Sequence, residues 1–113
     1  MAQRTEPTER TDILSKIVVD SEKGVVQFNL SPTDALSYAD LPRIVEKVYR
    51  EIQGSNVDVV KITGRGPVWL YSAVTHAVAH LAKAIAVFDA VNRRYVVVVT
   101  HSPEYRIGDV LSE

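Results

Sequence analysis

The stretch VDVVKITGRGPVWLYSAVTHAVAHLAKAIAVF, residues 57–88, decides the fold. It opens with an apolar run typical of a strand and turns at Gly64–Pro67. Apolar residues at helical spacing follow, and then a second apolar run. A strand, a helix and a strand in this order form a parallel crossover, which is right-handed in nearly all proteins. The stretch therefore predicts a right-handed parallel β-α-β crossover, with strands over Val57–Ile62 and Ala84–Phe88 and a helix over Pro67–Lys83.

Two strands and a helix are predicted upstream of this unit. The strands cover Ile13–Asp20 and Val25–Leu30, and Gly24 supplies the turn residue between them. The helix begins after Asp40, a favourable N-cap residue, and ends at Gly54. A pair of strands and a helix therefore lead into the crossover.

One further strand is predicted downstream. Tyr95–Val99 is nearly all apolar, as in a strand covered on both faces, and Ala90–Arg93 joins it to the preceding strand as a hairpin. The order is β-β-α-β-α-β-β, which predicts an α/β fold of the α+β sandwich type with a mixed sheet. Residues 1–12 are polar and aperiodic and are predicted to be a flexible N-terminal tail, which leaves residues 13–113 as a single domain.

The composition limits the classes of function. Among 113 residues, 46% are apolar and 24% charged, as in ordinary globular domains. No apolar run approaches the roughly 20 residues of a membrane helix, no signal-peptide pattern begins the chain, and there is no cysteine. These features predict a cytoplasmic protein without a membrane partner. The net charge of −1 argues against long nucleic acid as a ligand, whereas a small anion needs only a few aimed donors.

The predicted topology places the polar side chains at two opposite ends of the sheet. Arg65, Gly66 and the start of the second helix share one end with Asp89. His80 and His101 lie at the other end, because the helix and the last strand run in the opposite direction. Asp89 and His101 are then separated by about 17 Å, one strand length at about 3.3 Å per residue. We expect such groups to cooperate only between subunits.

Each candidate also has an ordinary structural interpretation. The Gly64–Pro67 turn can cradle a phosphate through helix N–H groups and the Arg65 guanidinium, or it can be a tight turn that requires glycine. Trp69 is typical of a core or an interface, with base stacking as the alternative. Glu104 is predicted to be a solvated surface charge.

The histidines and Asp89 can likewise have either a functional or an ordinary structural role. His76 and His80, four residues apart, can share a metal ion or can be partly exposed helix residues. Asp89 can bind a metal ion or can initiate a turn by accepting hydrogen bonds from its own backbone. His101 can be functional or can cap a loop.

Several motifs in the C-terminal half resemble those of the CRISPR-associated ring nucleases of the Csx-three (Crn-three) family. The motifs are GRGPVWL at residues 64–70, the histidines His76 and His80, VFD at 87–89, VVTHS at 98–102 and RIGDV at 106–110. The resemblance implies a homodimer that binds cyclic tetra-adenylate, the second messenger of type III CRISPR immunity, between dimers stacked head to tail. It also implies a phosphodiesterase that cuts the ring to linear di-adenylates with the help of manganese, which switches the signal off.

The same resemblance implies roles for individual residues. The catalytic candidates are His80, Asp89 and His101. The candidates for holding manganese are His80 and Asp89. The ligand-binding candidates are Arg65, Gly66, Trp69 and Arg93. This chain departs from the family pattern in a segment between Trp69 and Asp89 that is one residue longer, so both His76 and His80 are candidates for the main catalytic histidine. It also lacks the usual Asp-Pro-Arg turn.

The mechanism that fits these residues is in-line attack on the phosphodiester by the ribose 2′-OH or by a metal-activated water. His80 acts as general base or acid, and Asp89 of a facing subunit orients it or holds manganese. Arg65 or Arg93 offsets charge on the phosphorane oxygens. Three other functions stay open: a non-catalytic sensor of the ring, a metal-dependent RNA 3′ exonuclease, and an assembly protein whose Trp69 and histidines form an interface.

Overall fold

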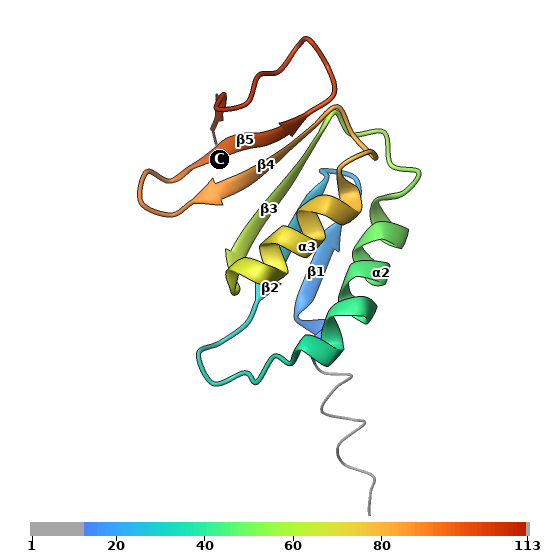
Figure 1. Ribbon diagram of the computed structural model, residues 1–113, viewed down its shortest axis with the longest axis vertical. Helices are drawn as coiled ribbons and strands as arrows, with labels where there is room; N and C mark the ends of the chain where they lie inside the picture. Colours follow the sequence, from blue (N-terminus) through green and yellow to red (C-terminus); the bar gives the residue numbers. More distant parts are fainter. Residues whose placement is uncertain (1–12, 113) are drawn as a thin grey trace, which may run out of the picture.

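The architecture is α/β, with a six-stranded mixed sheet that carries two helices on one face (Figure 1). It is seen in a computed structural model that describes residues 13–112. The predicted tail at residues 1–12 lies outside the described residues. The elements are β1 (Ile17–Asp20), β2 (Val25–Asn29), the 3₁₀ helix η1 (Tyr38–Asp40), α2 (Leu41–Ile52), β3 (Val59–Arg65), α3 (Val68–Val78), β4 (Ala84–Asp89), β5 (Arg94–Thr100) and β6 (Val110–Leu111). Within residues 13–112, no helix has the length and apolar character needed to span a membrane.

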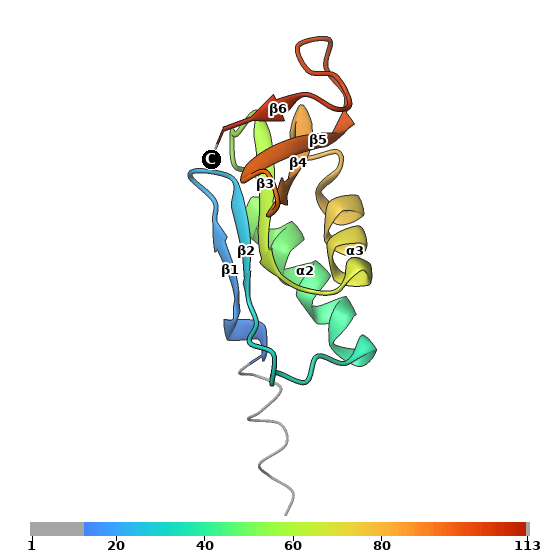
Figure 2. The same ribbon diagram turned by 90° about the vertical axis from the view of Figure 1, so that its left-hand side faces the viewer.

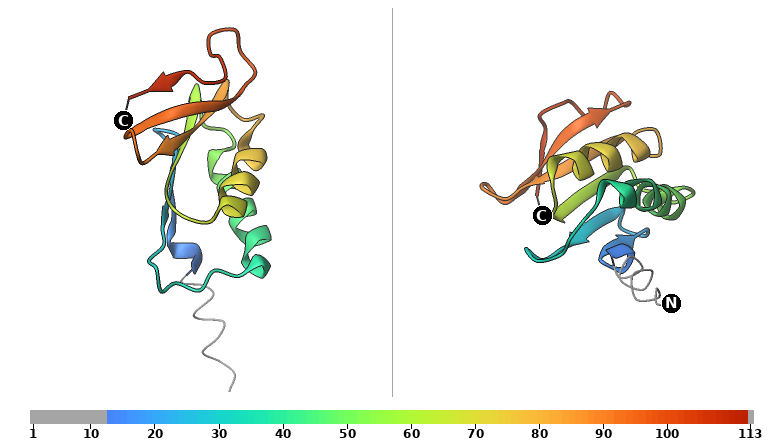
Figure 3. Two further views of the ribbon diagram at one scale, coloured as in Figure 1. Left: turned by 60° about the vertical axis from the view of Figure 1, so that its left-hand side comes forward. Right: turned by 60° about the horizontal axis from the view of Figure 1, so that its bottom comes forward.

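The sheet keeps its strands in chain order from β1 to β6. The three central strands β2, β3 and β4 are parallel, and β1, β5 and β6 add antiparallel pairs at the two edges. The parallel pairs are connected through α2 and α3, and both helices lie on the same face of the sheet (Figures 2 and 3). The predicted α/β sandwich, its mixed sheet and the parallel pairing of β3 with β4 are therefore confirmed.

The main core fills the space between the sheet and the helices. Each helix contributes residues four apart that are completely buried. These are Ile44, Val48 and Ile52 from α2 and Leu70, Val74 and Val78 from α3. A smaller cluster on the far face of the sheet contains Tyr95 and Val97, and Tyr105 and Leu111 pack against it. The C-terminal segment thus covers β4 and β5 on the side that has no helix.

Several predicted boundaries are wrong in instructive ways. Residues 13–15 are helical, and the strand starts only at Ile17. The helix α3 ends at Val78 instead of Lys83, because the chain must turn there to bring β4 beside β3: the N–H of Lys83 donates to the carbonyl of Asp58 at 2.9 Å. The short strand β6 was not predicted.

The predicted cap of α2 is also corrected. Asp40 occupies the N-cap position, but its carboxylate makes no capping hydrogen bond with that helix. It accepts instead from the Ser37 N–H at 3.1 Å, as part of a capping box on η1, and from the Arg43 guanidinium at 3.0 Å. The side chain is 1% exposed, so these charged and polar contacts replace the water that it has lost.

Gly64 marks the point where β3 bends towards α3, and it lies within the strand instead of in the predicted turn. Its φ of +105° is a conformation that other residues rarely adopt. It pairs with Phe28 of β2, and a Cβ atom added to it would lie 2.3 Å from the Phe28 carbonyl oxygen. The hydroxyl of Tyr71 on α3 donates a hydrogen bond to the Gly64 carbonyl. Glycine is therefore required here for close backbone approach.

We expect Gly64→Ala to lower the free energy of unfolding by about 2–4 kcal/mol, because both the positive φ and the clash with backbone atoms of β2 are unfavourable. Gly54→Ala is the matched control, since Gly54 also has a positive φ, +88°, but no atom lies within 4 Å of an added Cβ. It should lower the unfolding free energy by only about 1 kcal/mol. Urea unfolding of both variants measures the difference. Equal losses would show that the contact with Phe28 is unimportant.

Candidate functional site

Two histidines lie side by side at one end of the sheet. The ring centroids of His80 and His101 are 4.6 Å apart, and the ring planes are inclined by 25°, which is a stacked arrangement. His80 lies in the turn after α3, His101 directly follows β5, and both side chains are exposed. The placement of these two residues at the same end of the sheet agrees with the sequence prediction.

Strand pairing brings the two histidines together. In the β4–β5 pair, Ala84 lies opposite Thr100, so the residue before β4 lies beside the residue after β5. The N–H of His101 accordingly donates to the carbonyl of Lys83 at 2.8 Å. His80 precedes Lys83 by three residues in the same turn. The stacked imidazoles therefore follow from the register of an antiparallel pair.

The imidazoles border a shallow depression of about 420 Å³, lined by residues 55–58, residues 80–83 and His101. The hydroxyl of Ser55 is buried beside it and has no hydrogen-bond partner among residues 13–112. Buried hydroxyls are nearly always paired, so a water molecule or a ligand group is the expected partner. Sequence reasoning missed Ser55, because a serine in a loop carries no pattern of its own.

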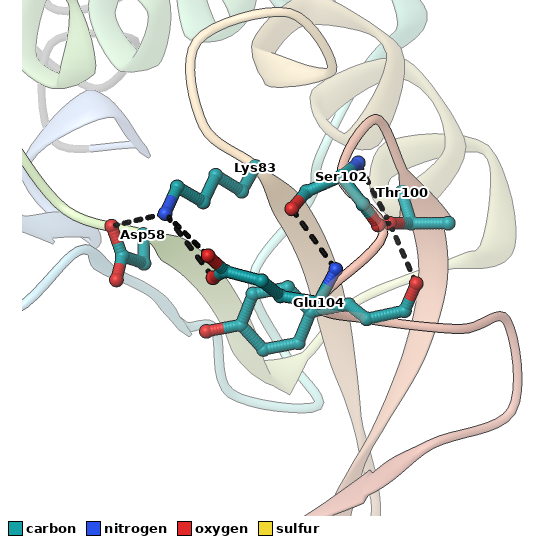
Figure 4. A network of polar contacts seen from close by, with 6 residues as sticks. Asp58, Lys83, Thr100, Ser102 and Glu104 are labelled. Carbon is teal, nitrogen blue, oxygen red and sulfur yellow. Dashed lines mark hydrogen bonds and ion pairs between the residues drawn. The ribbon is translucent and has the colours of Figure 1, made fainter.

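A second feature that sequence reasoning missed is a charged network next to His101 (Figure 4). The Lys83 ammonium lies 3.1 and 3.3 Å from the two carboxylate oxygens of Glu104 and 3.9 Å from a carboxylate oxygen of Asp58. The hydrogen bond that the Lys83 ammonium donates to Glu104 and the nearby charge of Asp58 raise the pKa of Lys83. Lys83 is therefore protonated at neutral pH. Glu104 is solvent-exposed, as predicted, and in addition forms an ion pair with Lys83 that the sequence did not indicate.

Asp89 lies at the opposite end of β4. Its Oδ1 accepts a hydrogen bond from the Val91 N–H at 3.1 Å, and its Oδ2 accepts one from the Asn92 amide at 2.9 Å. Chiefly because of Asn92, the pKa of Asp89 is lowered, so the group is a carboxylate at neutral pH. These contacts agree with the interpretation of Asp89 as a turn-initiating residue. They do not occupy all of its lone pairs.

Three of the four ligand-binding candidates lie at this second end of the sheet. Arg65 is the last residue of β3 and Asp89 is the last residue of β4. Because these two strands are parallel, both residues lie at the same end of the sheet. Gly66 follows it, and Arg93 lies in the β4–β5 turn with a φ of +58°. In open α/β sheets, ligands bind at the carboxyl ends of the parallel strands. Arg65 and Arg93 therefore form a second candidate surface, about 17 Å from the histidines by strand length.

Trp69 is partly buried in the first turn of α3. Its ring packs edge-on against Tyr38, with centroids 4.9 Å apart, and it packs against the main core. Tyr38 is 76% exposed, so this side of the aromatic pair is accessible from outside. The contacts fit the interpretation of Trp69 as a core or interface residue.

The two predicted manganese ligands are not brought together within one chain. His80 precedes β4 by four residues and Asp89 ends it, so the two side chains lie at opposite ends of the strand. No group of three or more histidine, aspartate or glutamate side chains with the spacing of a metal site occurs in residues 13–112. His76 does not join His80 either, because α3 ends before His80 and His76 faces a different groove. His80 and Asp89 can bind the same manganese ion only if they come from two different copies of the chain.

That groove, the α3 groove, lies between α3 and the strands β4 and β5 and has a volume of about 690 Å³. Its walls include Val68, Ser72, Thr75 and His76 from α3 and Val98 and Val99 from β5. In the described part of the chain, no Asp, Glu, Lys or Arg lines it. Val68 is 81% exposed at its edge. Such an uncharged, partly apolar surface is typical of an interface.

Comparison with known proteins agrees with the resemblance of the motifs. A curated relative, an uncharacterized protein of Aquifex aeolicus (strain VF5), is 44% identical over 52 residues, which cover 46% of this chain and 46% of the relative. The matched part is thus about half of that relative. No solved structure matches the chain significantly. The family profile described as CRISPR-associated protein (Cas_csx3) matches residues 28–112, from β2 to the residue after β6. The chain therefore belongs to the Cas_csx3 family of CRISPR-associated proteins.

Proposed function

We propose that the protein is a ring nuclease, a phosphodiesterase that cleaves cyclic tetra-adenylate to linear di-adenylates and so switches off type III CRISPR signalling. Membership of a CRISPR-associated family gives the biological setting. The observation that carries the proposal is the pair of exposed, stacked imidazoles of His80 and His101 beside a depression. Manganese is the proposed cofactor, held by residues from two copies of the chain.

Cleavage of a phosphodiester needs a group that removes a proton from the attacking oxygen and a group that protonates the leaving oxygen. An imidazole can do either near neutral pH. Two adjacent imidazoles can therefore supply both functions to one phosphodiester. Lys83 lies beside them, but its charge is offset by the carboxylates of Asp58 and Glu104. Additional cations are then needed to stabilise the phosphate oxygens in the transition state.

The second surface of another copy supplies these cations in the proposal. Arg65 and Arg93 lie at the opposite end of the sheet, where β3 ends and where β4 turns into β5. A head-to-tail contact between two copies places unlike surfaces against each other, so the histidine end of one copy faces the arginine end of the next. The cyclic ligand would lie between them. Asp89 would then orient an imidazole or bind manganese across the contact.

The proposal includes a homodimer as the unit that stacks, and the α3 groove supports it. The sequence of α3, VWLYSAVTHAV, has no Asp, Glu, Lys or Arg, although these residues make up 24% of the whole chain. Two such faces can associate without like-charge repulsion and with burial of Val68. An isologous contact through the α3 groove would not use the imidazole pair, Arg65 or Arg93, because none of these residues lines the groove.

A second candidate function is a sensor that binds the ring without cutting it. The observation that favours it is the Asp89 turn, in which both carboxylate oxygens already accept hydrogen bonds. If Asp89 only shapes the turn, the catalytic set of the ring nuclease is incomplete. The same surfaces would then bind the ligand through Arg65 and Arg93 alone.

The protein is incubated with cyclic tetra-adenylate, once with manganese and once with a chelator, and the products are identified by mass spectrometry. This experiment distinguishes the ring nuclease from the sensor. We expect manganese-dependent conversion to di-adenylates. His80→Ala should lower kcat by about 100-fold or more while binding is retained, because a general acid or base contributes about that factor. His76→Ala tests the other candidate histidine and should keep activity, because His76 faces the α3 groove and not the imidazole pair; loss of cleavage in this variant alone would assign the catalytic role to His76. Binding of an intact ring would favour the sensor, and neither binding nor cleavage would contradict both candidates.

Size-exclusion chromatography with light scattering tests the dimer. Val68→Asp places a charge in the α3 groove and should convert the dimer to a monomer, because a desolvated carboxylate without a partner is strongly unfavourable. Val91→Asp is the matched control: Val91 is 88% exposed in the β4–β5 turn, away from the groove, and the variant should stay dimeric. A Val68→Asp protein that is still a dimer would place the interface elsewhere.

A further inference from the structure

We propose that Lys83 is a positioning residue: through its ion pair with Glu104, it holds the loop that carries His101 so that this imidazole stacks on His80. The consequence for catalysis rests on the proposed function. The positioning itself does not, because it concerns the geometry of two side chains of this chain. Lys83 and Glu104 act on the loop from outside the imidazole pair, so neither needs to contact the ligand.

The backbone of Lys83 fixes the start of this loop. Lys83 directly precedes β4 and follows His80 by three residues. Its carbonyl accepts the His101 N–H at 2.8 Å, and its own N–H donates to the carbonyl of Asp58, the residue before β3. The main chain next to His80 is therefore bonded to the main chain of His101. Beyond this bond, the loop leaves the sheet.

The side chain of Lys83 holds the loop at a second point. The ammonium binds both carboxylate oxygens of Glu104, three residues after His101, and lies 3.9 Å from Asp58 (Figure 4). Asp58 belongs to the segment that leads into β3, the centre of the sheet. One cation thus connects the outer part of the loop to the framework.

Hydrogen bonds inside the loop transmit this restraint to His101. The Thr100 hydroxyl lies 3.0 Å from the Ser102 carbonyl and 3.1 Å from the Tyr105 carbonyl, and its oxygen is 3.2 Å from the Ser102 N–H. The Ser102 hydroxyl accepts the Glu104 N–H at 3.1 Å. Residues 100–105 therefore form a compact unit, in which a shift of Glu104 moves the backbone that carries His101.

The charges explain why Lys83 serves for positioning and not for binding phosphate. One ammonium faces two carboxylates, so the group of three has a negative net charge. A phosphate oxygen would have to displace Glu104 or Asp58 to reach the ammonium. The side chains of Lys83 and Glu104 are 44% and 58% exposed, and ion pairs at that exposure contribute little to global stability. Their loss should change the placement of the loop and leave the fold intact.

The first test measures the imidazole proton chemical shifts of His80 and His101 by NMR, without ligand. Stacked rings shift each other's protons upfield, so wild type should show this shift. Lys83→Met and Glu104→Gln should each reduce it, and Lys83→Arg should restore it, because arginine can also bind the carboxylate. Glu46→Gln is the matched control, since it removes an exposed pair on α2, in which Arg50 lies 2.6 Å from Glu46. It should leave the shift unchanged.

The second test measures cleavage of cyclic tetra-adenylate. Lys83→Met and Glu104→Gln should lower kcat about two- to fivefold, the range expected from an exposed ion pair, with KM unchanged. Lys83→Arg and Glu46→Gln should match wild type. Unchanged imidazole shifts in both disrupted variants would overturn the proposal, as would Lys83→Arg behaving like Lys83→Met. If wild type does not cleave the ring, the proposed function fails, and the imidazole shifts alone decide whether Lys83 positions His101.

Discussion

The pairing of β4 with β5 determines where the candidate residues lie. Ala84 lies opposite Thr100 at one end of this pair, and Asp89 lies opposite Arg94 at the other. Because β4 follows α3 and runs parallel to β3, His80 and Lys83 must lie where β4 begins. The return of the chain along β5 then brings His101 beside them. Hydrogen-bond register, and not any local feature of the histidines, produces the stacked imidazoles.

The same register keeps the two candidate surfaces apart. A chain of this size has one short sheet, and nothing in residues 13–112 folds back to bring Asp89 near His80. Each surface has some of the groups that cleavage of a phosphodiester requires. Imidazoles lie at one end of the sheet, and arginines and a carboxylate lie at the other. A contact between unlike ends of two copies would combine them. The imidazoles and the two arginines do not line the α3 groove, so a contact through this groove would be compatible with such stacking.

Much of this arrangement could be predicted from the sequence, because it depends on strand and helix order. The parallel unit within residues 57–88 and the opposite placement of Asp89 and His101 both followed from periodicity. The end of α3 could not be predicted: Ala79 to Lys83 continues the helical pattern without a breaker, and only the hydrogen bond from Lys83 to Asp58 shows that the chain has turned. The Lys83–Glu104 pair joins residues 21 apart in the chain, so no local spacing indicates it.

The central claim, that the site is completed between copies, is tested most directly by mixing two inactive variants. His80→Ala lacks the imidazole. Asp89→Asn lacks the negative charge and keeps one acceptor oxygen, which can still accept the Val91 N–H, but it loses the second acceptor, which binds the Asn92 amide. Each alone should fail to cleave cyclic tetra-adenylate. In the mixture, the intact Asp89 end of one variant can face the intact His80 end of the other, so cleavage should return. A mixture as inactive as its components, with wild type active, would contradict the claim and place all catalytic groups in a single chain.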